Sequence, residues 1–250
     1  QKINASGGTT ESIFTLDFTG KTGNVSIILP LRNTSGTPMN ASVDWGDGTS
    51  HIIRNSADAD LYHTYTSGGG NSYTIRVGGQ YQKIMSNGNT TSASSNTASS
   101  SDKTTARANW RDSLTSVYLG NAAFITTGLR QGFENCTALK TFTTKAGITN
   151  TSAVTNLQQT FAGCTSLETL DMSGMDTGNV TTMQNFHKVS AAKNLKLIGF
   201  HSRDLSSLAV GVGKGMADAW EIREFGDLQQ SYNDDYDGDG YTNIEEFYNQ

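Results

Sequence analysis

The first third of the chain places apolar and polar residues in short runs. These runs span residues 13–18, 25–31 and 73–77, and Gly, Asn and Ser residues typical of turns separate them. Because successive side chains of a strand point to opposite faces, the alternation predicts strands that each bury one face. We therefore expect residues 1–85 to form a small β-sandwich.

The next stretch has a different pattern. Residues 86–105 consist almost entirely of Ser, Thr, Asn, Ala and Gly. This composition offers too little apolar surface to offset the entropy that a chain loses on folding. We predict that residues 86–108 form a Ser/Thr-rich linker or a long surface loop.

From about Trp110 onward, apolar positions recur at long intervals. Similar four-residue runs open on leucines spaced 25, 28 and 28 residues apart, at Leu114, Leu139, Leu167 and Leu195. A second series joins an apolar residue, a polar pair and another apolar residue to a phenylalanine, at Phe133, Phe161 and Phe186. A period in the twenties predicts a solenoid over residues 109–205, in which each coil buries its apolar face against its neighbours.

One of these units carries a specific motif. Residues 161–173 read FAGCTSLETLDMS and residues 176–183 continue with DTGNVTTM. This unit resembles the BspA-like leucine-rich repeat of bacterial and protist surface proteins. The unit from Phe133 to Leu139 matches less completely. The last unit lacks the cysteine and has three extra residues before Leu195, as a terminal capping repeat would. The resemblance covers about 90 residues and implies a short leucine-rich-repeat solenoid.

The predicted sandwich contains a second recognisable pattern. Residues 43–49 read VDWGDGT, and they are followed by HTY at 63–65 and YTIRV at 73–77. The pattern resembles the signature of polycystic-kidney-disease-type (PKD-type) β-sandwiches. The local chemistry agrees, because Asp47-Gly48 is a favourable hairpin turn pair and Trp45 is a large apolar anchor for a thin core. His63 is expected to fill the strand position that this motif gives to histidine.

The C-terminal region has the spacing of a calcium-binding loop. In the twelve residues from Asp235 to Glu246, oxygen donors occupy positions 1, 3, 5, 9 and 12, and Gly240 occupies position 6. The peptide oxygen at position 7 supplies a further ligand. We predict that Ca²⁺ is bound by Asp235, Asp237, Asp239, Tyr241, Asn243 and Glu246. An acidic turn that binds nothing is the alternative.

A short helix is expected before this loop. Residues 215–226 have apolar side chains at helical spacing and end on Gly226. Helix and loop together resemble the C-terminal modules of secreted bacterial proteins, which are akin to dockerin and thrombospondin type 3 calcium repeats. The resemblance implies that residues 206–250 form a module braced by a structural ion. Calcium sensing is the weaker interpretation, because the chain has one such loop.

The remaining candidate chemistry is sparse. Cys136 and Cys164 occupy the same position in successive repeats, so a solenoid would stack them about 5 Å apart, the spacing of adjacent strands. A disulfide and a pair of buried thiols are both open at this point. The four histidines fall in different contexts without metal-ligand spacing, and no nucleophile elbow or phosphate-binding loop is present. We predict that the protein is not an enzyme.

Composition narrows the function further. Charged residues make up 16% of the chain, the net charge is −5, and the 18 Lys and Arg residues are scattered, so a nucleic-acid-binding face is not expected. No apolar run approaches the length of about 18 residues that predicts a membrane-spanning helix. The chain opens on Gln1 with no initiating Met. We take this as the expectation for a secreted protein whose signal peptide has been removed.

Together these features predict a mainly β chain with short helices: a PKD-like β-sandwich, a short leucine-rich-repeat solenoid and a C-terminal helix with a calcium loop. The function that we predict is that of an extracellular or cell-surface structural protein that self-associates into a homo-oligomer or filament. The alternative is an adhesin that binds a host protein or a glycan as a monomer. An enzyme with an unrecognised site is a third and weaker hypothesis.

Overall fold

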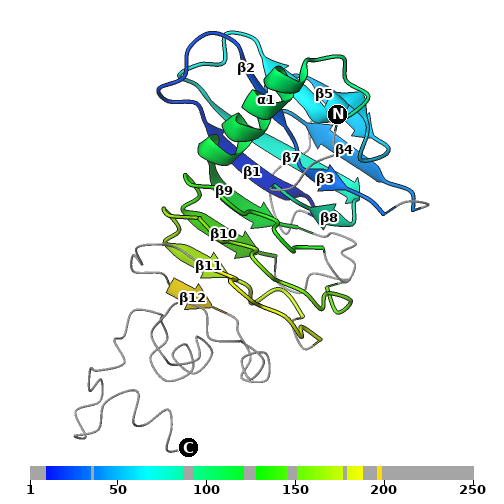
Figure 1. Ribbon diagram of the computed structural model, residues 1–250, viewed down its shortest axis with the longest axis vertical. Helices are drawn as coiled ribbons and strands as arrows, with labels where there is room; N and C mark the ends of the chain where they lie inside the picture. Colours follow the sequence, from blue (N-terminus) through cyan, green and yellow to red (C-terminus); the bar gives the residue numbers. More distant parts are fainter. Residues whose placement is uncertain are drawn as a thin grey trace, which may run out of the picture.

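The computed structural model describes residues 10–34, 37–86, 93–120, 128–145, 151–176, 179–187 and the backbone of 196–198. This part of the chain is mainly β, with one α-helix and a large sheet (Figure 1). Its elements are β1 (Ser12–Asp17), β2 (Val25–Ile28), β3 (Leu31–Arg32), β4 (Asn40–Asp44), β5 (Ser50–Ile53), the 3₁₀ helix η1 (Ala59–Leu61), β6 (Tyr62–Tyr65), β7 (Ser72–Gln80), β8 (Lys83–Ile84), α1 (Ser100–Ser113), β9 (Leu114–Leu119), β10 (Thr141–Thr144), β11 (Thr169–Asp171) and β12 (Lys196–Ile198).

The large sheet has eight strands in the order β12-β11-β10-β9-β1-β7-β4-β5. Strands β5, β4, β7, β1 and β9 pair antiparallel, whereas β9, β10, β11 and β12 pair parallel. Two further two-stranded sheets, β2-β6 and β3-β8, complete the N-terminal part. The strands expected within residues 13–18, 25–31 and 73–77 are therefore confirmed.

The antiparallel and parallel parts meet at β9, whose antiparallel partner is β1. Phe14 of β1 is paired with Ile75 of β7 on one side and with Val117 of β9 on the other. A register shift between Thr15 and Leu16 interrupts the β1–β9 pairing near its end. The part predicted to be a sandwich and the part predicted to be a solenoid thus share one continuous sheet.

The helix α1 lies where we predicted a linker or loop, since it covers the last nine residues of 86–108 and continues to Ser113. Ser99 caps its first turn, with its side chain accepting from the Asp102 backbone N–H while the Asp102 carboxylate accepts from the Ser99 backbone. This reciprocal capping satisfies two N–H groups that would otherwise lack partners. Ala106 and Trp110, four residues apart, are buried on one helix face. The low apolar content of this segment did not indicate a helix, because α1 buries only a narrow row of side chains that includes Ala106 and Trp110.

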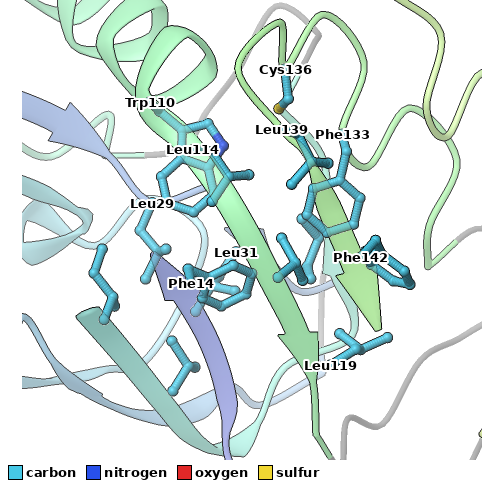
Figure 2. Close-up of a cluster of buried hydrophobic side chains, with 14 of the residues drawn as sticks. Phe14, Leu29, Leu31, Trp110, Leu114, Leu119, Phe133, Cys136, Leu139 and Phe142 are labelled. Atoms are coloured by element: carbon cyan, nitrogen blue, oxygen red, sulfur yellow. The ribbon is translucent and has the colours of Figure 1, made fainter. Parts of the chain in front are cut away.

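One apolar core runs through both parts of the sheet. The Trp110 ring lies 5.5 Å from the ring of Phe14, which places α1 on the inner face of β1. Figure 2 shows Trp110 on one side of β9, beside Leu114 of that strand, and the side chains of Phe133 and Phe142 on the other side. All five side chains are almost completely buried. Aromatic rings of this size contribute much of the burial that stabilises a thin β-rich protein.

The strand pairing corrects one predicted alignment. The leucine series places residue 170 opposite residue 198, but the structure pairs Leu170 with Leu197, an offset of 27 residues in place of 28. The earlier offsets of 25 and 28 agree with the pairing of Thr141 with Ser116 and of Thr169 with Thr141. The sequence could not fix the last register, because residues 195, 197 and 198 are all apolar and either alignment offers an apolar residue.

Candidate functional site

The predicted calcium ligands Asp235, Asp237, Asp239, Tyr241, Asn243 and Glu246 lie outside the described residues, as does the helix expected at 215–226. The calcium site therefore stays a prediction. In the described ranges, no group of three or more His, Cys, Asp and Glu side chains is arranged to hold a metal ion. No helix in those same ranges is long and apolar enough to cross a membrane.

The most developed polar arrangement lies at the turn between β4 and β5. The Trp45 backbone N–H donates to the carbonyl oxygen of Thr49 at 3.1 Å, which closes the turn that Asp47-Gly48 predicted. Gly46 and Gly48 have φ angles of +79° and +90°, a left-handed region that favours glycine. The Asp47 carboxylate accepts from the N–H and the hydroxyl of Thr49 at 3.0 and 2.6 Å. The turn therefore holds one oxygen of this carboxylate, Oδ1, in place.

Two histidines flank the indole of Trp45. The His63 ring stacks on it with centroids 4.4 Å apart and an angle of 5° between the planes. At the edge of the indole, the Trp45 Nε1–H donates to Nδ1 of His51 at 2.9 Å. The expectation that His63 lies in a strand is confirmed, since it belongs to β6. The sequence showed the histidines in different contexts without metal-ligand spacing and did not indicate that His51 and His63 lie near each other, with ring centroids 6.4 Å apart.

The His63–Asp47 pair links β6 to the turn. His63 Nε2 lies 2.7 Å from Oδ2 of Asp47. Burial lowers the pKa of His63, and the Asp47 carboxylate opposes that shift without overcoming it. Burial acts to raise the pKa of Asp47, but hydrogen bonds from Thr49 and His63 outweigh it and hold this pKa below its usual value. At neutral pH the pair is therefore a carboxylate that accepts a hydrogen bond from a neutral imidazole.

Tyr65 of β6 also contacts Trp45 and His63. Its hydroxyl donates to the carbonyl oxygen of Trp45 at 3.0 Å, and its ring lies edge-on to His63 at 4.7 Å. Burial raises the pKa of Tyr65 far above its usual value, so the hydroxyl stays protonated. The polar atoms of Trp45, Asp47, His63 and Tyr65 are thus engaged in holding the turn against β6. These contacts stabilise the position of the turn. Acid–base catalysis would instead need a proton acceptor directed at a substrate.

The repeats bring together side chains that are far apart in sequence. Phe133 and Phe161 stack with centroids 5.6 Å apart, and Phe186 meets Phe161 edge-to-face at 5.3 Å. A parallel series of side-chain amides runs beside them, with Gln158 donating to Gln184 at 3.0 Å. Each ring or amide thus contacts its equivalent one repeat away. The stacking confirms that the phenylalanine series marks equivalent positions.

Cys136 and Cys164 are buried and free. The Cys164 thiol donates to the carbonyl oxygen of Phe133 at 3.1 Å. Burial raises the pKa of the Cys136 thiol to about 12 and raises that of Cys164 well above its ordinary value. Reactivity belongs to the thiolate, so burial disfavours reaction at both thiols. Of the two interpretations left open by the sequence, the structure contains the pair of buried thiols.

Comparison with known protein families gives a match over part of the chain. Residues 127–233 match the family described as Mycoplasma protein of unknown function, DUF285. The matched range covers the repeats that follow β9 and stops short of Asp235, so it includes neither the N-terminal strands nor the predicted calcium loop. No curated protein and no solved structure matches the chain.

Proposed function

We propose that the chain is a secreted, non-catalytic structural protein of the cell surface or extracellular space, which self-assembles into an oligomer or filament and carries a structural calcium ion. The observation that carries this proposal is the continuous eight-stranded sheet, which ends in the described part at the open edge of β5. A long sheet with an open edge offers backbone groups for contacts between molecules.

The finer architecture is part of the same proposal. The parallel strands β9 to β12 recur every 25 to 28 residues and stack in order. This spacing supports a short solenoid of the BspA-like leucine-rich-repeat type over residues 109–205. The Trp45 turn and its contacts with His63 and Tyr65 support a PKD-like sandwich over residues 1–85.

The β5 edge has few of the features that block association. Ile52 is 42% exposed and is the one large apolar side chain in the described ranges that faces solvent to this extent. Strand β5 contains no Pro or Lys, and no described strand pairs with its outer side. Natural edge strands commonly carry such residues to prevent pairing with other chains. A contact between β5 and a different surface of the next copy would be heterologous. If such contacts do not close into a ring, they build a filament.

Mass photometry of the purified full chain with calcium tests self-assembly. We expect species larger than the monomer that grow with concentration. Ile52→Lys should shift them toward the monomer, because it places a charge on the edge. Ser152→Lys adds the same charge at an exposed turn in the parallel part and should leave assembly unchanged. A wild-type protein that stays monomeric at high concentration would contradict the proposal.

The proposed calcium brace has its own test. Extracellular sites work at dissociation constants of about 10⁻⁴ to 10⁻³ M, so EDTA should remove the ion and lower thermal stability or assembly. Asp237→Ala removes a proposed ligand and should abolish the response to calcium. Asp234→Ala removes a carboxylate just before the loop and should retain it. Equal calcium responses in the two variants would rule out the predicted ligand set.

A second candidate function is adhesion to a glycan or a host protein by a monomer. It is favoured by the face of the large sheet that lies away from the core. A row of half-buried hydroxyl residues crosses four strands there, and Tyr118 is paired with Ile13 beside it. The row consists of Thr15, Ser116, Thr141 and Thr169. A tyrosine ring combines an apolar face with a polar tip, which suits sugar stacking. Glycan-array binding that is lost in Tyr118→Ala would favour adhesion over assembly.

A further inference from the structure

Strand β5 forms the open edge of the large sheet, and its backbone groups alternate in direction. The Trp45 N–H donates to the Thr49 carbonyl oxygen, so residues 45 and 49 are a hydrogen-bonded pair at the end of the β4–β5 hairpin. Hydrogen-bonded and non-hydrogen-bonded pairs alternate along antiparallel strands, which puts Ser50 and Ile52 in non-hydrogen-bonded pairs with β4. The N–H and C=O groups of both residues therefore point away from β4, toward the open edge.

Most of these outward groups have no partner within the described part of the chain. No described residue bonds to the backbone N–H or C=O of Ser50, or to the N–H of Ile52. The Arg54 guanidinium donates to the Ile52 carbonyl oxygen at 3.3 Å, a long bond that leaves the second lone pair of this oxygen open. The free edge ends at Arg54, because its own N–H donates to the Asp58 carboxylate at 2.9 Å.

The two free edge residues complement a second copy of themselves. When two β5 strands pair antiparallel with Ser50 of each copy opposite Ile52 of the other, each of these pairs exchanges two N–H···O=C bonds. Every outward group of both residues is then used. A register that places Ile52 opposite Ile52 would bring Ser50 opposite Arg54, whose N–H is already bonded to Asp58. The pattern of free groups thus selects one register, with the twofold axis at His51.

The side chains of this edge fit the same pairing. Ile52 is 42% exposed, and the two copies of Ile52 would lie diagonally across the axis, within reach of each other. Arg54 of one copy would lie opposite Gly48 of the other, where no side chain blocks it. That turn also carries the exposed carboxylates of Asp44 and Asp47. Opposite charges therefore meet twice across the axis, which favours a second copy over an unrelated extended peptide.

We propose that β5 pairs antiparallel with β5 of a second copy, in a symmetric dimer that places Ser50 of each copy opposite Ile52 of the other. This inference rests on the proposed self-assembly and specifies one of its contacts. The contact is isologous, since the same strand is used by both copies, and it joins the two large sheets into one. Because such a contact closes on itself, a longer assembly needs a second surface.

Cysteine cross-linking of the full chain tests this register. Cα atoms of a hydrogen-bonded pair lie about 5.5 Å apart, within the range of about 4.4–6.8 Å for disulfides, whereas diagonal neighbours lie about 7–8 Å apart. Ser50→Cys and Ile52→Cys proteins, mixed under reducing conditions and then oxidised, should form a disulfide-linked dimer. Either variant oxidised alone should not. Ser152→Cys, an exposed residue of the parallel part, mixed with Ile52→Cys is the matched control and should not cross-link.

Mass spectrometry of peptides identifies the joined cysteines, and Cys136 and Cys164 are buried. Circular dichroism establishes that the variants are folded. A dimer that forms equally in Ser50→Cys alone or in Ile52→Cys alone would show another register and overturn the proposal. Species larger than the monomer in mass photometry, without a cross-link in the mixture, would also overturn it and would leave the proposed self-assembly standing. A wild type that stays monomeric would contradict the self-assembly and this pairing with it.

Discussion

The antiparallel strands and the parallel strands of the large sheet are held together in different ways. In the antiparallel part, β4 and β5 are joined by a turn of five residues, and a second layer containing β2, β6 and α1 covers the sheet. In the parallel part, paired strands are 25 to 28 residues apart, and each repeat contacts mainly the repeats beside it. The antiparallel part thus buries its apolar face under a second layer. The parallel part buries its apolar residues between successive repeats, so its first and last repeats each need a capping neighbour.

Because of this difference, the stability of the repeats should depend on the pairing of β1 with β9. The first parallel strand, β9, has β1 as its other neighbour, so the antiparallel sheet serves as the cap for the repeats. Helix α1 runs directly into β9, and its Trp110 contacts Phe14 of β1. Stability in the parallel part should therefore depend on the antiparallel part through this junction.

The largest effect is expected at the junction itself. Trp110→Ala removes a buried ring and should cost about 3–5 kcal/mol of unfolding free energy. Denaturant titration followed by circular dichroism measures the loss, which should affect both parts together. Trp110→Phe keeps a ring against Phe14 and loses no hydrogen bond, because the buried indole N–H has no partner. If the alanine variant were as stable as the phenylalanine variant, the ring would not join the two parts.

A smaller effect is expected at the turn of the antiparallel part. A Cβ at Gly46 would lie 2.5 Å from the carbonyl oxygen of Thr74, and the residue also has a positive φ angle. Gly46→Ala should therefore cost about 2–4 kcal/mol, measured by denaturant titration. Gly20 has a φ of +84° but open space around it, so Gly20→Ala should cost only about 1 kcal/mol. Equal losses would show that the contact with β7 does not constrain the turn.

A pH dependence is expected in the parallel part. Burial lowers the pKa of His187 to about 4, whereas an unfolded histidine titrates near 6.5. As the pH falls below about 6.5, the unfolded state takes up the proton first, so stability decreases toward pH 4 by up to about 3 kcal/mol. Melting temperatures of the wild type and His187→Gln between pH 7 and 4.5 measure this, and the variant should show the flatter profile.

His63 provides the comparison in the antiparallel part. Its pKa is also lowered by burial, but Asp47 opposes the shift, so His63→Gln should flatten the pH profile less than His187→Gln does. A profile that is unchanged in both variants would mean that neither imidazole is kept neutral by the fold.

The sequence predicted what depends on local chemistry. Asp47-Gly48 indicated the turn, Trp45 indicated the core anchor, and the leucine and phenylalanine series indicated equivalent positions in the repeats. In each case the relevant residues are close in sequence or recur with a regular period. The mainly β fold and the strand positions followed from those patterns.

What the sequence missed depends on contacts between distant segments. The pairing of Phe14 with Val117 joins strands about a hundred residues apart, and no pattern within either strand specifies its partner. The helix α1 was hidden by its polar composition, although Ser99 with Asp102 formed a capping box that could have revealed it. His51 joined the Trp45 cluster through a bond across the turn, which spacing rules for metal ligands do not detect.

Native-state hydrogen exchange, read by mass spectrometry, tests most directly whether the two parts form one unit. If β1 caps the repeats, amides of β7, β9 and β10 should open with similar free energies, and Trp110→Ala should lower all of them together. If instead β10 and β11 exchange at a lower free energy of their own, and that value is the same in Trp110→Ala as in the wild type, the parallel part folds independently and the account is contradicted.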